Sequence, residues 1–353
     1  MPSPTLFDPL SIGSLTLKNR IVMAPLTRCR ASAGRVPNAL MADYYRQRSS
    51  AGLILSEATS VTPMGVGYPD TPGIWSDEQV QGWQLVTDAV HQQGGLIFLQ
   101  LWHVGRISDP VYLNGATPVA PSAIKPAGHV SLVRPMKDFE TPRALTLAEI
   151  SEVVDAYRQG AINAKAAGFD GVHIHGANGY LLDQFLQDST NLRDDQYGGS
   201  LENRARLLLE VTDACIDVWG AGRDGVHLAP RMDAHDMADS NPTATFGYVA
   251  TELGKRGIAF ICAREAEGDD SLGPQLKRQF GGVYIANEKF DKASAHNALQ
   301  QGTADAVAFG VPYIANPDLV ARLQQDAPLN AAKPELFYAS GAEGYTDYPF
   351  LAQ

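Results

Sequence analysis

The chain has 353 residues, of which 44% are hydrophobic and 19% charged, and this composition is typical of a folded globular protein. It carries 28 basic and 39 acidic residues, which gives a net charge of -11. This acidic balance argues against nucleic acid or an anionic membrane as a partner, because phosphate binding needs a basic surface. We therefore expect a small-molecule substrate.

The first predicted elements are a small hairpin over residues 6–20, expected to close the floor of a barrel, and an apolar strand over residues 21–26. Seven more short apolar runs follow, at residues 53–58, 96–103, 171–176, 225–230, 258–265, 282–287 and 306–310. Runs that are continuously apolar, rather than alternating, are typical of strands buried on both faces of a parallel sheet.

Helical patterns fill the gaps between these runs. In residues 76–95 a capping-box pattern begins at Ser76, and in residues 145–168 Thr146 is the expected N-cap. Eight strands that alternate with helices predict a (β/α)8 TIM barrel in which residues 1–353 form one domain. An open doubly wound sheet is the alternative, and the lack of a GxGxxG motif after an early strand disfavours it.

Residues 104–145, which follow the third strand, are too many for an ordinary βα loop. Segments of this length in compact domains are usually lids or binding loops. We therefore expect an inserted segment that caps the barrel.

The cysteines Cys29, Cys215 and Cys262 are too few and too scattered for a disulfide framework, and they suit a reducing cytosol. No apolar run approaches the roughly 18 to 20 residues that a membrane span needs. The segment MPSPTLFDPL lacks the pattern of a signal peptide. The sequence thus predicts a cytoplasmic protein that does not span a membrane.

Active sites of TIM barrels lie at the C-terminal ends of the strands. Amide, hydroxyl and imidazole groups dominate among the polar residues there, which include Thr27, Glu57, Gln100, His103, His175, Asn178, Tyr180, His227, Arg264 and Asn287. No metal-ligand spacing and no GxSxG motif occurs, so neither a metal site nor a nucleophile elbow is expected. A ring of neutral hydrogen-bonding groups suits a flavin, whose phosphate would lie at the loops that begin at Asn287 and Gly310.

Several long motifs are spread over nearly the whole chain. They include LFDPLSIGSLTLKNRIVMAPLTR, YYRQRSSAGLILSEAT, LQLWHVGR, HGANGYLLDQFLQDSTNLRDDQYGGSLENRARLLLEV, YIANPDL and GYTDYPFL. In these motifs the chain resembles the old yellow enzyme family of flavin-dependent ene-reductases, particularly the bacterial morphinone, N-ethylmaleimide and pentaerythritol tetranitrate reductases.

The resemblance implies FMN across the top of the barrel, with NADPH or NADH as the reductant. The positions that match cofactor-binding residues are Pro25, Leu26, Thr27, Ala58, Gln100, His227, Asn287, Gly310 and Val311. It also implies reduction of activated C=C bonds in α,β-unsaturated carbonyls, maleimides and nitroalkenes, by a monomer or homodimer.

His175 and Asn178 match the pair that holds the carbonyl or nitro oxygen of an electron-poor alkene. Such a pair stabilises the charge that develops as hydride leaves flavin N5. Tyr180 matches the acid that protonates the α-carbon, and a phenol with a pKa of ~10 is a neutral donor at pH 7. The aromatic positions that match the substrate cavity are Tyr68, Trp102 and Tyr345.

Two positions depart from the family pattern. His227 stands where relatives usually carry an arginine beside the flavin, and Val311 stands where they commonly carry an arginine for the FMN phosphate. One hypothesis is that Arg231 or Arg264 supplies the missing charge, and the alternative is that both are ordinary surface arginines. His173 is expected to be a deeper residue without direct contact to the substrate.

Two further interpretations of the function remain open. The main activity could be reduction of nitroaromatics or nitrate esters, or the chain could be a barrel that binds flavin weakly and has a binding role. The intact set of His175, Asn178 and Tyr180 argues against a pure binding protein, since such a protein has no need of a proton donor.

Overall fold

The computed structural model describes residues 4–232 and 234–352, and within them eight parallel strands form a closed ring. The strands are β3 (Ile21–Met23), β4 (Leu53–Leu55), β6 (Ile97–Trp102), β9 (Gly171–His175), β10 (Asp224–Leu228), β11 (Phe260–Arg264), β12 (Val283–Asn287) and β13 (Ala306–Phe309). Each strand pairs with the next in chain order, and β13 pairs with β3 to close the ring. The predicted TIM barrel is confirmed.

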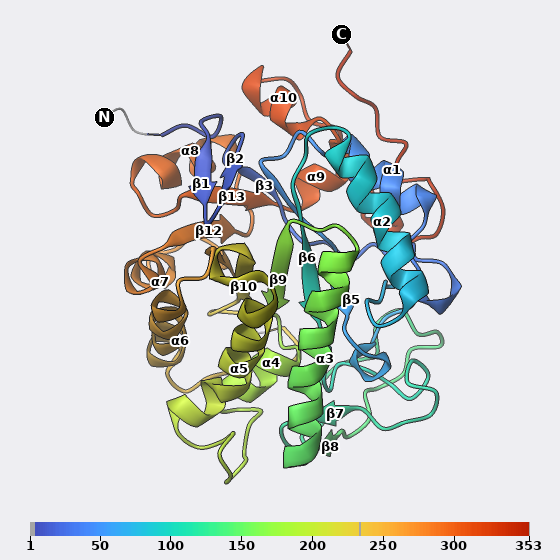
Figure 1. The fold of residues 1–353 in the computed structure, drawn as a ribbon, viewed down its shortest axis with the longest axis vertical. Helices are drawn as coiled ribbons and strands as arrows, with labels where there is room; N and C mark the ends of the chain where they lie inside the picture. The colour runs from blue at the N-terminus through green and yellow to red at the C-terminus, as the bar shows by residue number, and fades with distance from the viewer. Residues whose placement is uncertain (1–3, 233, 353) are drawn as a thin grey trace.

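Helices surround this ring (Figure 1). The longer ones are α1 (Ala39–Gln47), α2 (Asp77–His91), α3 (Leu147–Ala166), α5 (Leu201–Trp219), α6 (Pro242–Arg256), α7 (Gly273–Phe280) and α8 (Lys292–Gln300). The shorter ones are α4 (Leu181–Leu186), α9 (Val311–Ala315) and α10 (Leu319–Gln324), with 3-10 turns η1 (Ala33–Arg35), η2 (Pro63–Gly65), η3 (Ala221–Arg223) and η4 (Pro334–Leu336). Capping boxes begin α2 at Ser76 and α3 at Thr146, as the sequence predicts.

The N-terminal hairpin closes the end of the barrel at which the strands begin. Strands β1 (Leu10–Ile12) and β2 (Leu15–Leu17) pair antiparallel, and both Ile12 and Leu17 are completely buried in the apolar cluster inside the ring. The turn at Gly13 has a φ of 51° and presses on Gly222, whose oxygen would lie 2.0 Å from an added Cβ. The hairpin is therefore fixed against η3, directly before β10 begins.

Large and small residues alternate in the layer of the barrel interior next to this hairpin. The rings of Phe98 and Phe260 lie 5.7 Å apart and fill the space left by Gly171 and Gly225, where an added Cβ would lie 2.4 Å from a ring atom. Because side chains alternate along a strand, the next inward positions are two residues further on. Those positions hold polar side chains, which form the base of the candidate site.

The inserted segment over residues 104–145 lies at the opposite end of the barrel from the hairpin (Figure 1). Its short strands β7 (Val119–Ala120) and β8 (Arg143–Ala144) pair in parallel. Its side chains Val130 and Phe139 pack in one buried cluster with Trp102 at the end of β6. The segment thus covers the strand ends on one side of the site. Over the described ranges, no helix has the length and apolar character of a membrane span.

Candidate active site

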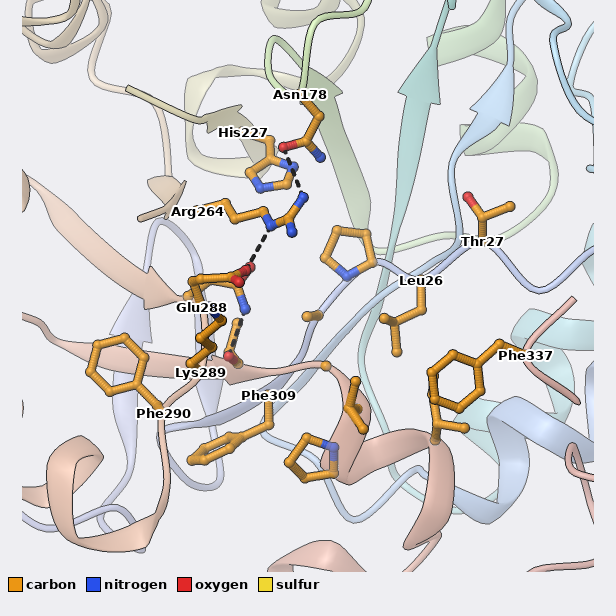
Figure 2. Close-up of a pocket in the computed structure, with 18 of the residues that line it drawn as sticks. Leu26, Thr27, Asn178, His227, Arg264, Glu288, Lys289, Phe290, Phe309 and Phe337 are labelled. Atoms are coloured by element: carbon orange, nitrogen blue, oxygen red, sulfur yellow. Dashed lines mark hydrogen bonds and ion pairs between the residues drawn. The ribbon is translucent and has the colours of Figure 1, made fainter. Parts of the chain in front are cut away.

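A cavity of about 490 Å³ opens where the barrel strands end, a size in the range of small-molecule sites (Figure 2). Eight residues predicted from the sequence line it: Pro25, Leu26, Thr27, Asn178, His227, Asn287, Gly310 and Val311. Other lining residues include Arg264, Glu288, Lys289, Phe290, Phe337 and Tyr338. The cavity therefore collects groups from seven different regions of the chain.

The turn after β9 orients two of the predicted catalytic side chains. Asn178 and Gly179 have φ values of 58° and 76°, a left-handed conformation that asparagine and glycine adopt most readily. The Gly179 amide donates to the Asp183 carboxylate at 2.8 Å, and the His235 ring nitrogen Nδ1 lies 2.7 Å from the Asn178 carbonyl oxygen. Asn178 consequently faces the cavity, and Tyr180 follows at the N-cap position of α4.

A group of aromatic rings lies beside this turn. The Tyr180 ring lies 5.0 Å from both His175 and Trp102, in edge-to-face contact, and Tyr68 stacks on Trp102 at 5.4 Å. The hydroxyl oxygens of Tyr68 and Tyr180 are 2.8 Å apart and share a hydrogen bond. Burial, and then the nearby Tyr68, raise the pKa of Tyr180 well above its usual value. The group therefore holds a phenolic proton firmly at Tyr180 Oη.

A second group, of imidazole rings, lines the interior of the barrel. The Gln100 amide nitrogen Nε2 lies 3.2 Å from Nδ1 of His173 and 3.2 Å from Nδ1 of His227. The His175 ring lies 5.2 Å from His227. Burial, followed by the charge of Arg264, lowers the pKa of His227 to about 3, so that this imidazole is neutral at pH 7.

Arg264 is the cavity-lining arginine that can supply positive charge. Its Nε donates to the Glu288 carboxylate at 2.7 Å, and its Nη1 makes a weak contact of 3.4 Å with the Asn178 side-chain oxygen (Figure 2). Arg231 instead donates to Glu265 at 2.6 Å and to Asp270 at 2.5 Å, and it is not among the described residues that line the cavity. Of the two arginines named by the sequence hypothesis, geometry favours Arg264.

The C-terminal segment reaches the cavity through Phe337 and Tyr338. Arg28 Nε donates to the Phe337 carbonyl at 3.0 Å, and Arg30 Nη1 donates to the same carbonyl at 2.8 Å. These bonds hold the segment over the strand ends.

Tyr345, expected to line the substrate cavity, lies elsewhere. It is completely buried, its ring stacks on Tyr44 at 4.1 Å, and it is not part of the cavity lining in the described chain. No residue of the motif GYTDYPFL (344–351) is part of this lining, and the C-terminal segment reaches the cavity instead through Phe337 and Tyr338, which precede the motif. Their positions depend on the hydrogen bonds from Arg28 and Arg30. These arginines are about three hundred residues away in the chain, so no local sequence pattern predicts the contact.

Some lining residues that the sequence analysis did not name could have been predicted from their position after a strand. Glu288, Lys289 and Phe290 directly follow the end of β12, and residues after barrel strands are candidates for any site of this fold. His235, in the loop after β10, contacts Asn178 but follows no motif. The sequence candidates His175, Tyr180, Ala58, Gln100, Tyr68 and Trp102 are not part of the described lining. Gln100 and His175 contact the lining residue His227, and Tyr180 and Trp102 lie next to His175.

The donor set fits a flavin. His227 Nε2 is buried, yet it has no hydrogen-bond partner among the described residues, although its side chain lines the cavity. A buried polar atom of this kind calls for a partner, and a flavin edge offers carbonyl oxygens and ring nitrogens. In the same described part of the chain, no group of three or more His, Cys, Asp or Glu residues could hold a metal ion.

Comparison with known proteins agrees with this geometry. Residues 5–330 match the model of the NADH:flavin oxidoreductase / NADH oxidase family. A probable flavin mononucleotide-dependent alkene reductase of Leishmania infantum is 43% identical over 358 residues, which cover 98% of this chain and 97% of the relative.

Two solved structures share the whole fold. The old yellow enzyme homologue from Zymomonas mobilis has a TM-score of 0.96 and 46% identity, and the match covers 99% of this chain and 100% of that chain. Morphinone reductase in complex with tetrahydroNAD has a TM-score of 0.95 and 49% identity, with 99% and 98% covered. This chain therefore belongs to the NADH:flavin oxidoreductase / NADH oxidase family, as an FMN-dependent enzyme of the old yellow enzyme type.

Proposed function

We propose that this enzyme reduces activated C=C bonds in α,β-unsaturated carbonyls, maleimides and nitroalkenes, with NADPH or NADH as the reductant. When bound, FMN supplies the hydride chemistry that links the nicotinamide to the alkene. The observation that carries the proposal is the phenol of Tyr180, held protonated beside His175 and two residues after Asn178. The names of a related alkene reductase and of morphinone reductase with tetrahydroNAD support it.

In this proposal, the cofactor is held by residues that follow several different barrel strands. The isoalloxazine would contact residues Pro25 to Thr27, together with Ala58, Gln100 and His227, and the phosphate would lie near Asn287, Gly310 and Val311. The cavity lining supports this arrangement, because one cavity is lined by Pro25, Leu26, Thr27 and His227 of the first set and by all three residues of the second. Arg264 would offset negative charge in place of the arginines that relatives carry.

His175 and Asn178 would bind the oxygen of the substrate's activating group. Burial, and then the neighbouring His227, lower the pKa of His175 well below its usual value. A neutral imidazole and a side-chain amide can both donate hydrogen bonds, and donors that are fixed before the reaction stabilise the charge that develops on a carbonyl or nitro oxygen.

Tyr180 would deliver the proton to the α-carbon. Its hydroxyl is bonded to Tyr68 Oη at 2.8 Å, so its position is set before the substrate arrives. A pKa raised above the usual value keeps the proton on the phenol until a strongly basic carbon develops beside it.

A visible spectrum and one assay test the proposed function. We expect the purified protein to carry flavin absorbance and to oxidise NADPH or NADH when cyclohexenone is added. The proposal fails if the protein is colourless and added FMN restores no cyclohexenone-dependent oxidation of either nucleotide.

A further inference from the structure

His173 is a buried polar residue to which the proposed function gives no role. It is completely buried and lies inside the barrel, level with Gln100 on β6 and with Gly225 on β10. Its ring stacks on the His227 ring at 5.3 Å, with 26° between the planes, and packs against Phe260 at 5.5 Å. His173 therefore acts on the cavity only through its neighbours.

The Gln100 amide joins His173 to His227. Its nitrogen Nε2 carries two hydrogens and lies 3.2 Å from Nδ1 of each ring. In this orientation of the amide both Nδ1 atoms accept, because an amide nitrogen only donates, and the proton of each neutral imidazole then lies on Nε2. Nε2 of both histidines is buried without a partner in the described part of the chain, and of the two residues it is His227 that lines the cavity.

The two histidines together determine which way the amide points. With the NH2 group between the two rings, both Nδ1 atoms accept. A flipped amide would place its oxygen there, and this oxygen could accept from both rings only if the two imidazoles moved their protons from Nε2 to Nδ1 together. If only His227 remained, the change of a single tautomer would be enough: the amide could turn, its oxygen could accept a hydrogen bond from His227 Nδ1–H, and His227 Nε2 would become an acceptor. An acceptor at that atom would repel a flavin carbonyl or ring-nitrogen lone pair.

We propose that His173 is a positioning residue which, through the Gln100 amide, fixes His227 as the Nε2-protonated tautomer and so presents a hydrogen-bond donor to the flavin. The inference rests on the proposed function in one respect, namely that His227 faces the cofactor. In this inference His173 and His227 act as a coupled pair. His227 donates a hydrogen bond to the flavin as a neutral imidazole, where relatives use an arginine.

Burial is consistent with neutral rings. Burial, followed by the nearby His227, lowers the pKa of His173 well below its usual value, and burial lowers that of His227 to about 3. Two stacked imidazolium rings would repel each other, whereas two neutral rings can share one amide.

The test compares His173→Phe, which keeps a ring but removes the acceptor, with His173→Asn, whose side-chain oxygen can replace Nδ1. Nitrogen-15 NMR of the FMN-free protein reports the tautomer of His227, with its signals assigned by their loss in His227→Asn. Titration of the same protein with FMN gives the dissociation constant. His173→Leu replaces His173→Phe if the larger ring prevents folding.

We expect Nε2-protonated His227 in the unmodified chain and in His173→Asn, with FMN dissociation constants within about twofold of each other. His173→Phe should shift His227 toward Nδ1 protonation and raise the FMN dissociation constant at least fivefold. Nδ1-protonated His227 in the unmodified chain overturns the inference, and so does an unchanged tautomer in both His173→Phe and His173→Leu. Failure of the unmodified chain to bind FMN would instead refute the proposed function, since the tautomer is measured without the cofactor.

Discussion

Arg264 occupies the cavity wall at the end of β11, and its guanidinium is already paired with Glu288 at 2.7 Å. Glu288 has a φ of 108°, an unusual conformation for a residue with a side chain, and this backbone directs it to the strand end next to Arg264. An anionic ligand would compete with Glu288 for the same guanidinium. In the proposed function, Arg264 would be the residue that offers positive charge to the cofactor.

We predict that Arg264→Ala raises the FMN dissociation constant about tenfold or more, because a hydrogen bond to a charged group contributes about 1.5 to 3 kcal/mol. Arg231→Ala is the matched control, since Arg231 is paired with Glu265 and Asp270 away from the cavity lining of the described chain. Fluorescence titration of the FMN-free protein measures both constants. An equal effect of the two substitutions, or none from Arg264→Ala, would show that Arg264 does not carry this charge.

Among single elements, strand β10 has the cavity-lining His227 near its end and a buried carboxyl group at its beginning. It begins at Asp224, which is completely buried, and neither carboxylate oxygen has a partner among residues 4–232 and 234–352. Burial, followed by the charge of Asp213, raises the pKa of Asp224 well above its usual value. The folded chain therefore holds this proton in a pH range where the unfolded chain releases it.

The sign of the resulting pH dependence follows from proton linkage. Above the unfolded pKa of about 4, the unfolded state binds fewer protons at this site than the folded state, so stability falls as pH rises toward the folded pKa. Asp224→Asn should remove this fall of stability with rising pH, because the amide does not titrate. The unfolding free energy of the variant minus that of the unmodified chain should increase by at least about 1 kcal/mol between pH 4.5 and pH 7. Denaturant unfolding at several pH values measures it, and a constant difference would contradict a raised pKa.

The elements themselves were well predicted because their signals are local. All eight apolar runs form barrel strands, and the capping patterns at Ser76 and Thr146 begin α2 and α3. The predicted strand at residues 21–26 is shorter in the structure and ends at Met23, two residues before Pro25. The apolar run continues past the last residue that is hydrogen-bonded to a neighbouring strand. The sequence alone does not show where that strand pairing ends.

At the scale of the whole molecule, the site depends on contacts between distant segments. The residues that end strands could be predicted from the barrel pattern, so Thr27, Asn178, His227 and Asn287 were found. Phe337 could not be, because Arg28 and Arg30 hold its carbonyl from the other end of the chain. The link between His173 and His227 through Gln100 likewise appears only when three strands lie side by side.

In the proposed function, an alkene would receive hydride and then a proton from Tyr180 in one site. Rapid-mixing measurements on the FMN-loaded Tyr180→Phe variant separate the two half-reactions. Tyr157→Phe is the control, because Tyr157 is a buried tyrosine of the outer helix α3.

We predict that FMN reduction by NADPH or NADH stays within about twofold of the unmodified enzyme. Reoxidation by cyclohexenone should slow about a hundredfold or more, since general acid catalysis typically contributes 10² to 10⁴. Equal slowing of both half-reactions, or unchanged reoxidation, would contradict the assignment of Tyr180 as the proton donor.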